Sequence, residues 1–178
     1  MAEAPLRIVL VGFMGSGKSS VGRELARRLG YRFEDMDRRI ERRLGRSIAS
    51  IFEEQGEEAF RAEEYREAAS LAGLEGAVVA TGGGAFAQAK TRDALSKGAL
   101  TIWLRCDLEA MRRRLPADGT RPLAGNHVIM QALLAQREPS YRLADITVDA
   151  SEGTPAEVAK RVAHLIEQRT TESRHTDR

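Results

Sequence analysis

The chain has 178 residues, of which 42% are hydrophobic and 30% are charged, and its formal net charge is only +2. This composition excludes a disordered or fibrous protein, and the length fits one domain spanning residues 1–178. Lys and Arg residues are interleaved with nearly as many acids, which does not indicate a basic surface for nucleic acid or acidic membranes. We therefore expect neither nucleic acid nor a membrane as a partner.

The cellular setting is indicated by what the sequence lacks. Cys106 is the single cysteine, so no internal disulfide can form, which fits a reducing compartment. Residues 1–5 lack the features of a signal peptide, and no apolar stretch approaches the ~20 residues that span a membrane. We expect a soluble, cytoplasmic protein.

The first half of the chain alternates between strand and helix patterns. Residues 6–11 form an apolar run typical of a buried strand, and a glycine-rich segment follows at once. The predicted elements that come next are a helix at 18–29 ending at Gly30, a strand at 31–35, a helix at 38–44 ending at Gly45, a short helix from Ser47 to Gly56, a long helix at 57–74 and a strand at 77–81.

The second half continues the alternation. Its predicted elements are a helix at 91–96, a strand at 99–104, a basic helix from the cap Asp107 to about residue 115, a helix at 128–137, a strand at 146–148 and a last helix. Residues 116–127 contain turn dipeptides and are predicted to be a mobile lid. Thr154 and Glu157 have the spacing of a capping box before the last helix. Beyond Arg169 we expect a disordered tail, residues 170–178.

The order of these elements predicts the fold class. Strands that alternate with helices long enough to be crossovers indicate an α/β fold of three layers, with a central parallel sheet of about five strands and helices on both faces. In such sheets ligands collect at the carboxyl ends of strands. The glycine-rich segment, Asp35 and the triple glycine at 82–84 all follow strands, so we expect them at one edge.

Residues 12–19, GFMGSGKS, match the spacing of a phosphate-binding P-loop. The glycines let backbone N–H groups turn toward an anion, and the following helix adds its positive end. Lys18 is placed to neutralise the β and γ phosphates of a nucleoside triphosphate, and Ser19 to give a hydroxyl ligand to Mg²⁺. The alternative is a flexible structural turn.

The phosphoryl acceptor must be inferred from other residues, because a P-loop alone fits kinases, motors and switches. The Asn-Lys-x-Asp of a GTPase is absent. Asp107 resembles the acid of a Walker B strand, but capping its helix explains it as well and is favoured. Asp35 and Asp37 follow the strand beside the loop, so one carboxylate can face the metal and the other an acceptor hydroxyl. The alternative for Asp37 is an N-cap of the next helix.

Two arginines indicate that the phosphoryl acceptor carries a carboxylate group. Considered singly, Arg61 and Arg137 would each be interpreted as surface residues. Arginine is, however, the usual partner of a carboxylate, and Gly83 allows the backbone to approach a ring closely. Together with Asp37, they indicate a hydroxylated carboxylic acid.

These motifs together resemble the shikimate kinase family, within the wider group similar to nucleoside monophosphate kinases. The resemblance runs from about residue 6 to residue 162 and rests on segments 12–19, 35–37, 45–48, 51–52, 58–61, 82–85, 121–123 and 137–141. It implies transfer of the γ-phosphoryl group of ATP to the 3-hydroxyl of shikimate, with one Mg²⁺ ion, by a chain that is a monomer.

The resemblance also implies a role for each matching residue. Lys18, Asp37 and Arg121 would be catalytic, and Ser19 and Asp35 would hold the metal. ATP would be bound by Gly15, Ser16, Gly17, Lys18, Ser19, Ser20, Arg114 and Arg121, and shikimate by Asp37, Arg61, Gly83 and Arg137. Phe52 and Phe60 would pack near the ring, and Glu64 would fix Arg61.

Several alternatives stay open on the sequence alone. Arg114 lies in a basic run with Arg112 and Arg113 that also fits a solvated helix face, and the two phenylalanines also fit plain core packing. The nearest alternative function is that of another small-molecule kinase, such as a gluconate kinase, but recognition of such a substrate would not explain the triple glycine. A non-catalytic ATP-binding regulator would not need Lys18, Asp37 and Arg121 together.

Overall fold

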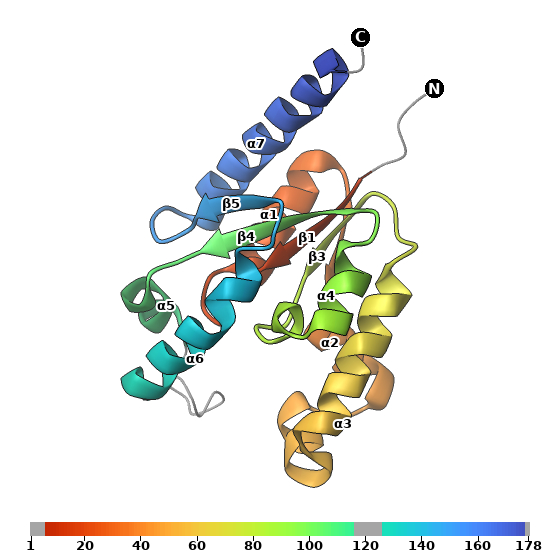
Figure 1. Ribbon diagram of the computed structural model, residues 1–178, viewed down its shortest axis with the longest axis vertical. Coiled ribbons are helices and arrows are strands. Elements are labelled where there is room, and N and C mark those ends of the chain that lie inside the picture. The colour runs from red at the N-terminus through yellow and green to blue at the C-terminus, as the bar shows by residue number, and fades with distance from the viewer. Residues whose placement is uncertain (1–5, 116–125, 177–178) are drawn as a thin grey trace.

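The computed structural model describes residues 6–115 and 126–176, and its centre is a five-stranded sheet (Figure 1). All neighbouring strands are parallel, in the order β2-β3-β1-β4-β5. The strands are β1 Arg7–Val11, β2 Arg32–Asp35, β3 Ala77–Ala80, β4 Ala99–Arg105 and β5 Ile146–Asp149. The predicted α/β fold class, with a parallel sheet of five strands, is confirmed.

Helices cover both faces of this sheet (Figure 1). They are α1 Lys18–Leu29, α2 Met36–Leu44, α3 Ile48–Leu71, the short 3-10 helix η1 Ala85–Ala87, α4 Ala89–Ser96, α5 Leu108–Arg114, α6 His127–Tyr141 and α7 Pro155–Thr176. Alternate side chains of β1 enter two separate cores. Ile8 and Leu10 pack in the cluster with residues of α1 and α7, whereas Val9 and Val11 pack with residues of α2, α3, α4, α5 and α6.

The start of α2 corrects one interpretation of the sequence. Asp35, not Asp37, is the N-cap, because its carboxylate accepts a hydrogen bond from the backbone N–H of Arg38 at 3.2 Å. The helix therefore begins at Met36, two residues earlier than predicted, and Asp37 lies in its first turn. Capping does not explain the side chain of Asp37.

Helix α3 joins the two helices that the sequence predicted on either side of Gly56. The backbone at Gly56 has φ 82° and ψ 175°, so the helix is kinked there. It ends at Leu71 rather than residue 74, with a hydrogen-bonded turn that follows. The prediction of two helical segments meeting at this glycine is therefore close to the structure.

Two helices are longer than predicted. Helix α6 runs to Tyr141, four residues past Arg137, and contains Pro139. Helix α7 continues to Thr176, so the backbone is helical over most of the segment for which a disordered tail was expected. The physical reason is that no glycine or proline follows Pro155 to stop the helix. Residues 116–125 of the predicted lid and residues 177–178 lie outside the described residues.

Ion pairs connect α2 to α3. The guanidinium of Arg39 pairs with Glu34 at 3.0 Å and with Glu67, and that of Arg43 pairs with Glu63 at 2.7 Å and with Glu67 at 3.4 Å. Glu67 is buried, so these bonds form in a partly desolvated environment where they are stronger than on the surface. They hold α2 in a defined position relative to the second half of α3.

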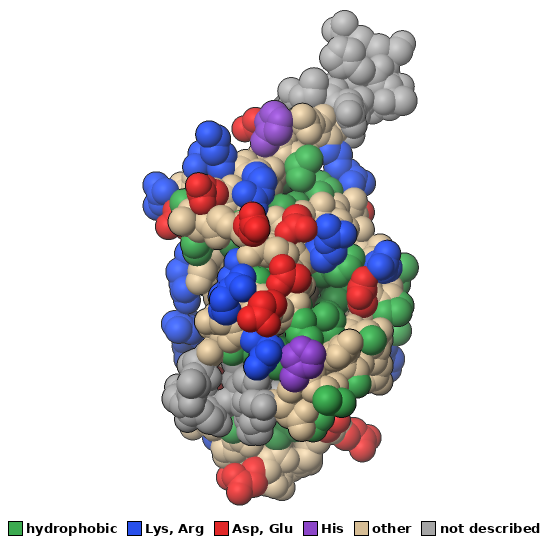
Figure 2. Space-filling model, turned by 90° about the vertical axis from the view of Figure 1, so that its left-hand side faces the viewer, with side chains coloured by type: hydrophobic (Ala, Val, Ile, Leu, Met, Phe, Trp, Pro, Cys, Tyr) green, Lys and Arg blue, Asp and Glu red, His purple; other side chains and the backbone are tan. Residues whose placement is uncertain are grey.

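The surface seen in Figure 2 carries acidic and basic side chains interspersed with each other and with apolar ones. Among the described residues, none of the helices is both long enough and apolar enough to cross a membrane.

Candidate active site

The glycine-rich loop between β1 and α1 has a shape that requires glycine. Gly12, Gly15 and Gly17 have φ of 145°, 77° and 93°. A Cβ atom on Gly12 would lie 2.8 Å from the carbonyl oxygen of Leu104, and one on Gly15 would lie 2.8 Å from that of Met111. Side chains are excluded by the neighbouring backbone, so the loop can present its own N–H groups.

Lys18, the first residue of α1, lies against this loop. Its side chain is largely buried, and its ammonium group donates hydrogen bonds to the carbonyl oxygens of Gly12 at 2.8 Å and Phe13 at 2.9 Å. Ser16 is fully buried inside the loop, whereas Ser20 is exposed on α1. The predicted phosphate-binding residues are thus brought together by a strand, a tight loop and a helix N-terminus.

Ser19 and Asp35 form a pair of oxygen groups beside the loop. The Ser19 hydroxyl donates to Oδ2 of Asp35 at 2.8 Å, while Oδ1 of the same carboxylate caps α2. Hydroxyl and carboxylate oxygens suit Mg²⁺, which takes few protein ligands and completes its shell with phosphate and water. No cluster of three or more His, Cys, Asp or Glu side chains suited to a metal occurs in the described part of the chain. The pair fits a phosphate-associated Mg²⁺ better than an all-protein metal site.

Arg61 is held from two sides by carboxylates. Its Nη1 donates to Glu64 at 2.5 Å, and its Nη2 pairs with Glu57 at 3.0 Å. Glu64 is buried, with 1% of its side chain exposed, whereas 65% of the Glu57 side chain is exposed. Burial raises the pKa of Glu64, and Asp37 raises it further, against the opposing effects of Arg61 and Arg137. The two acids and two arginines therefore share one electrostatic environment.

The triple glycine after β3 lies against the charged side chains of Asp37, Arg61 and Arg137. A Cβ atom on Gly82 would lie 2.7 Å from Oδ1 of Asp37, and one on Gly84 would lie 2.6 Å from Nη1 of Arg61. A Cβ atom on Gly83 would lie 3.6 Å from Nη1 of Arg137. The absence of side chains here lets three charged groups from three helices approach a single turn.

Arg137 reaches the same turn from α6. Its guanidinium lies over the ring of Phe13, 5.6 Å from the ring centroid, which places it beside the phosphate-binding loop as well. Four residues further along α6, the hydroxyl of Tyr141 donates a hydrogen bond to the carbonyl oxygen of Gly83. The acceptor-side residues predicted from the sequence, Asp37, Arg61, Gly83 and Arg137, are thus all brought together.

The two predicted ring-packing residues also touch each other. The rings of Phe52 and Phe60 lie 4.7 Å apart between centroids, at 39° to each other. Phe60 is buried and carries the Arg61 guanidinium over its face at 5.4 Å, whereas Phe52 is partly exposed. Phe60 thus has a packing role in the core, and Phe52 presents a ring at the surface.

Arg114 lies at the far end of the loop, in an exposed position. It donates to the carbonyl oxygen of Ser151 at 3.0 Å and to Sγ of Cys106 at 3.5 Å, and its Nη1 comes within 3.9 Å of a Cβ atom built on Gly17. These contacts are more specific than a solvated helix face would make. Burial raises the pKa of the Cys106 thiol, which favours its uncharged form.

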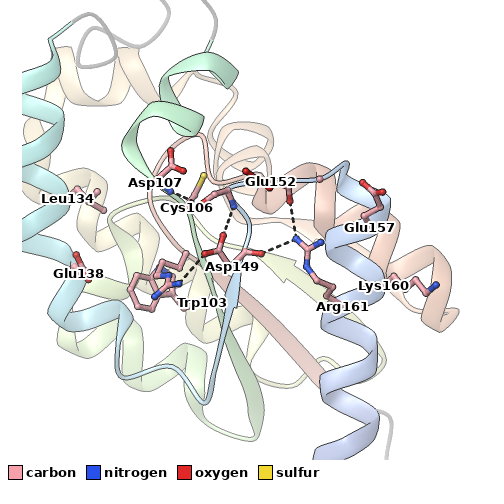
Figure 3. A pocket seen from close by; sticks show the side chains of 13 residues that line it. Trp103, Cys106, Asp107, Leu134, Glu138, Asp149, Glu152, Glu157, Lys160 and Arg161 are labelled. Atoms are coloured by element: carbon pink, nitrogen blue, oxygen red, sulfur yellow. Dashed lines mark hydrogen bonds and ion pairs between the residues drawn. The ribbon is translucent and has the colours of Figure 1, made fainter.

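A cavity of about 990 Å³ opens next to Arg114, between β4, β5, α6 and the start of α7 (Figure 3). Its lining includes Cys106, Asp107 and Ser151, and Arg161, which also lines it, donates to the carbonyl oxygens of Asp149 and Glu152. Asp107 caps α5 by accepting from the N–H of Ala110 at 2.7 Å, as the sequence analysis favoured. The lining includes neither Lys18 nor Asp37, so the cavity adjoins the phosphate loop rather than containing it.

The structure also shows site residues that the sequence analysis gave no role. The hydroxyl of Tyr141 and the carboxylate of Glu57 contact predicted site residues, and Phe13 lies under Arg137. The i, i+4 spacing of Glu57 and Arg61 was visible in the sequence, but the contacts of Tyr141 and Phe13 join distant segments. Arg121 lies outside the described residues.

A parallel sheet whose first strand leads into a lysine-bearing glycine loop, with charged acceptor-side residues at the same edge, defines a P-loop phosphotransferase. The family model for shikimate kinase matches residues 14–167. A curated shikimate kinase of Geobacter sulfurreducens is 42% identical over 164 residues, covering 90% of this chain and 91% of the relative. The chain belongs to the shikimate kinase family.

Solved structures agree with this assignment. A structure titled shikimate kinase from Acinetobacter baumannii in complex with shikimate is 37% identical, has a TM-score of 0.88, and covers 93% of this chain and 94% of its own. A gluconokinase from Sinorhizobium meliloti has a TM-score of 0.60 at 22% identity, covering 95% of this chain and 98% of its own. The second likeness concerns the fold alone.

Proposed function

We propose that this protein transfers the γ-phosphoryl group of ATP to the 3-hydroxyl of shikimate, giving shikimate 3-phosphate for aromatic amino-acid biosynthesis. The family membership and the relative of known structure with bound shikimate support this substrate. The observation that carries the proposal is the meeting of Arg61 and Arg137 over the triple-glycine turn, beside Asp37. Two guanidinium groups next to a carboxylate suit an acid that also carries hydroxyl groups.

On the donor side, the backbone of the glycine loop and Lys18 bind the ATP phosphates. Gly15, Ser16, Gly17, Ser19 and Ser20 complete this set. Ser19, and Asp35 through water, would hold Mg²⁺, which when bound neutralises part of the phosphate charge. Arg114 and the cavity beside it are proposed to receive the adenine base, and Arg121 is proposed to reach the phosphates from the lid.

On the acceptor side, Arg61 and Arg137 bind the substrate carboxylate while the Gly83 backbone lies under the ring. Asp37 orients the attacking 3-hydroxyl and accepts its proton as the oxygen bonds to the γ phosphorus. The β-phosphate oxygen of ATP leaves in line with the attack, so ADP carries away the electron pair. Catalysis of this kind rests on positioning and on fixed charges.

A coupled assay of ADP release tests this proposal directly. The purified protein is supplied with ATP and Mg²⁺ and with shikimate, gluconate, a nucleoside monophosphate or no acceptor. We expect turnover with shikimate alone and a product whose phosphate is on the 3-hydroxyl by NMR. Turnover with gluconate instead would favour another small-molecule kinase, and ATP binding without any turnover would favour a regulator.

A further inference from the structure

Tyr141 is a buried residue at the end of α6 that the proposed reaction leaves without a role. Its side chain is fully buried and packs against Trp103, with ring centroids 6.0 Å apart. A phenylalanine would satisfy this packing equally well. Burying a hydroxyl costs free energy unless it is hydrogen-bonded, so the contacts of this hydroxyl deserve a separate explanation.

The hydroxyl group connects two of the proposed substrate-binding residues. It donates to the carbonyl oxygen of Gly83 in the triple-glycine turn. Burial raises the pKa of Tyr141 to about 12, although the nearby charge of Arg137 acts in the opposite direction. The phenol therefore stays protonated over the whole range in which a kinase is assayed, and it donates to Gly83 with the Arg137 guanidinium close by.

This arrangement matters because Arg137 and Gly83 come from distant parts of the chain. Arg137 and Tyr141 are four residues apart on α6, so their side chains lie on the same helix face. The Gly83 turn follows β3. Without the hydroxyl, Arg137 would keep its charge, but the turn that it faces would lose its hydrogen bond and the guanidinium a polar neighbour.

We propose that Tyr141 is a positioning residue, whose hydroxyl sets the orientation of Arg137 and the Gly83 turn toward the carboxylate-bearing substrate. The proposal rests on the proposed function, in which Arg137 and Gly83 bind shikimate. The aromatic ring stabilises the core, whereas the hydroxyl serves substrate binding. These two contributions can be separated by experiment.

The test is Tyr141→Phe, compared with Tyr65→Phe, which removes the same atom from a partly exposed ring beside Lys90. Tyr141→Phe leaves the buried Gly83 carbonyl and Arg137 without this partner, so we expect the KM for shikimate to rise by about five- to fiftyfold. The KM for ATP and the kcat should change by less than about twofold, because among the described residues the hydroxyl is hydrogen-bonded neither to the phosphate-binding loop nor to Asp37. Tyr65→Phe should resemble the unmodified enzyme.

A double-mutant cycle with Arg137→Ala separates positioning from general loosening. If the hydroxyl acts through Arg137, Tyr141→Phe should change the KM for shikimate by less than about twofold in the Arg137→Ala background. Equal effects in both backgrounds would overturn the proposal, as would a lower Tm of Tyr141→Phe with an unchanged KM. Absence of shikimate turnover in the unmodified protein would instead refute the proposed function.

A measurement on the unmodified protein keeps the proposal testable if Tyr141→Phe does not fold. Exchange of the tyrosine hydroxyl protons with solvent can be followed by NMR in protein with labelled tyrosine. We expect slow exchange at Tyr141, slower still at saturating shikimate, and fast exchange at Tyr65. Fast exchange at Tyr141, or a rate that shikimate leaves unchanged, would overturn the proposed role.

Discussion

Replacement of Gly84 by alanine should weaken shikimate binding by displacing Arg61. The backbone at Gly84 has φ −100° and ψ −12°, which alanine adopts without strain, so the added methyl group is the only perturbation. Its Cβ atom would lie 2.6 Å from Nη1 and 2.7 Å from Nη2 of Arg61. Ordinary contact begins near 3.4 Å, so the guanidinium must move by most of an ångström.

Displacement of the Arg61 guanidinium should raise the KM for shikimate. The bond between Arg61 and Glu64 is 2.5 Å long, and the guanidinium cannot retreat from Gly84 without changing it. The displaced guanidinium keeps its charge but loses part of an aligned, charge-assisted contact worth about 1.5–3 kcal/mol, so we expect the KM for shikimate to rise by about 5- to 20-fold, less than on removal of the side chain. The Tm should change little, because the clash is with the flexible end of a side chain rather than with backbone.

Steady-state kinetics with varied shikimate at saturating ATP provide the assay. Gly73→Ala is the matched control, because a Cβ atom there meets no atom of the described residues within 4 Å and its φ is not positive. A KM for shikimate that is the same in Gly84→Ala and Gly73→Ala would refute the reasoning. A large fall in Tm for Gly84→Ala would show that the backbone, not Arg61, absorbs the clash.

Three further predictions concern the acceptor-side residues and the buried Arg7. Asp37→Asn should lower kcat by about 10²- to 10⁴-fold with little change in ATP affinity by calorimetry, because it removes a proton acceptor; near-normal kcat would contradict the role. Arg61→Ala and Arg137→Ala should each raise the KM for shikimate by about 10- to 100-fold in the coupled assay, and unchanged KM values would exclude carboxylate binding there. Arg7→Met should lower the free energy of unfolding, measured in urea, by about 2–4 kcal/mol and leave kcat unchanged. The reason is that the buried guanidinium of Arg7 donates hydrogen bonds to carbonyl groups at the ends of α3 and α4. Arg32 is exposed, so Arg32→Met should lower the free energy of unfolding much less, and equal losses in the two variants would contradict the prediction.

The local conformation of the chain was readable from the sequence. The apolar run before Gly12 and the cap at Gly30 define a strand, loop and helix, because glycine and helix-terminus preferences act over a few residues. The capping box at Thr154 is confirmed for the same reason, with Thr154 and Glu157 hydrogen-bonded to each other's backbone. The alternation of such elements was sufficient to predict the parallel sheet.

The start of α2 was predicted two residues too late, where competing signals were close together. Asp35 and Asp37 are both good caps, and the choice of Asp35 depends on where β2 ends against β3. The disordered tail expected beyond Arg169 stays a prediction; the backbone of α7 is helical to Thr176, and its first turns pack in the core through Val158 and Val162.

The sequence by itself thus determined the fold class, the phosphate loop and, through the family resemblance, the set of candidate site residues. Only the tertiary structure decided how the acceptor side is assembled: Asp37, Arg61 and Arg137 approach the triple-glycine turn from three helices, and the Tyr141 hydroxyl donates to Gly83. The physical reason is that these contacts join helices and a turn that meet only when the sheet is complete. Short-range patterns specify the elements, whereas the distances between charged groups from different elements depend on packing of the whole core.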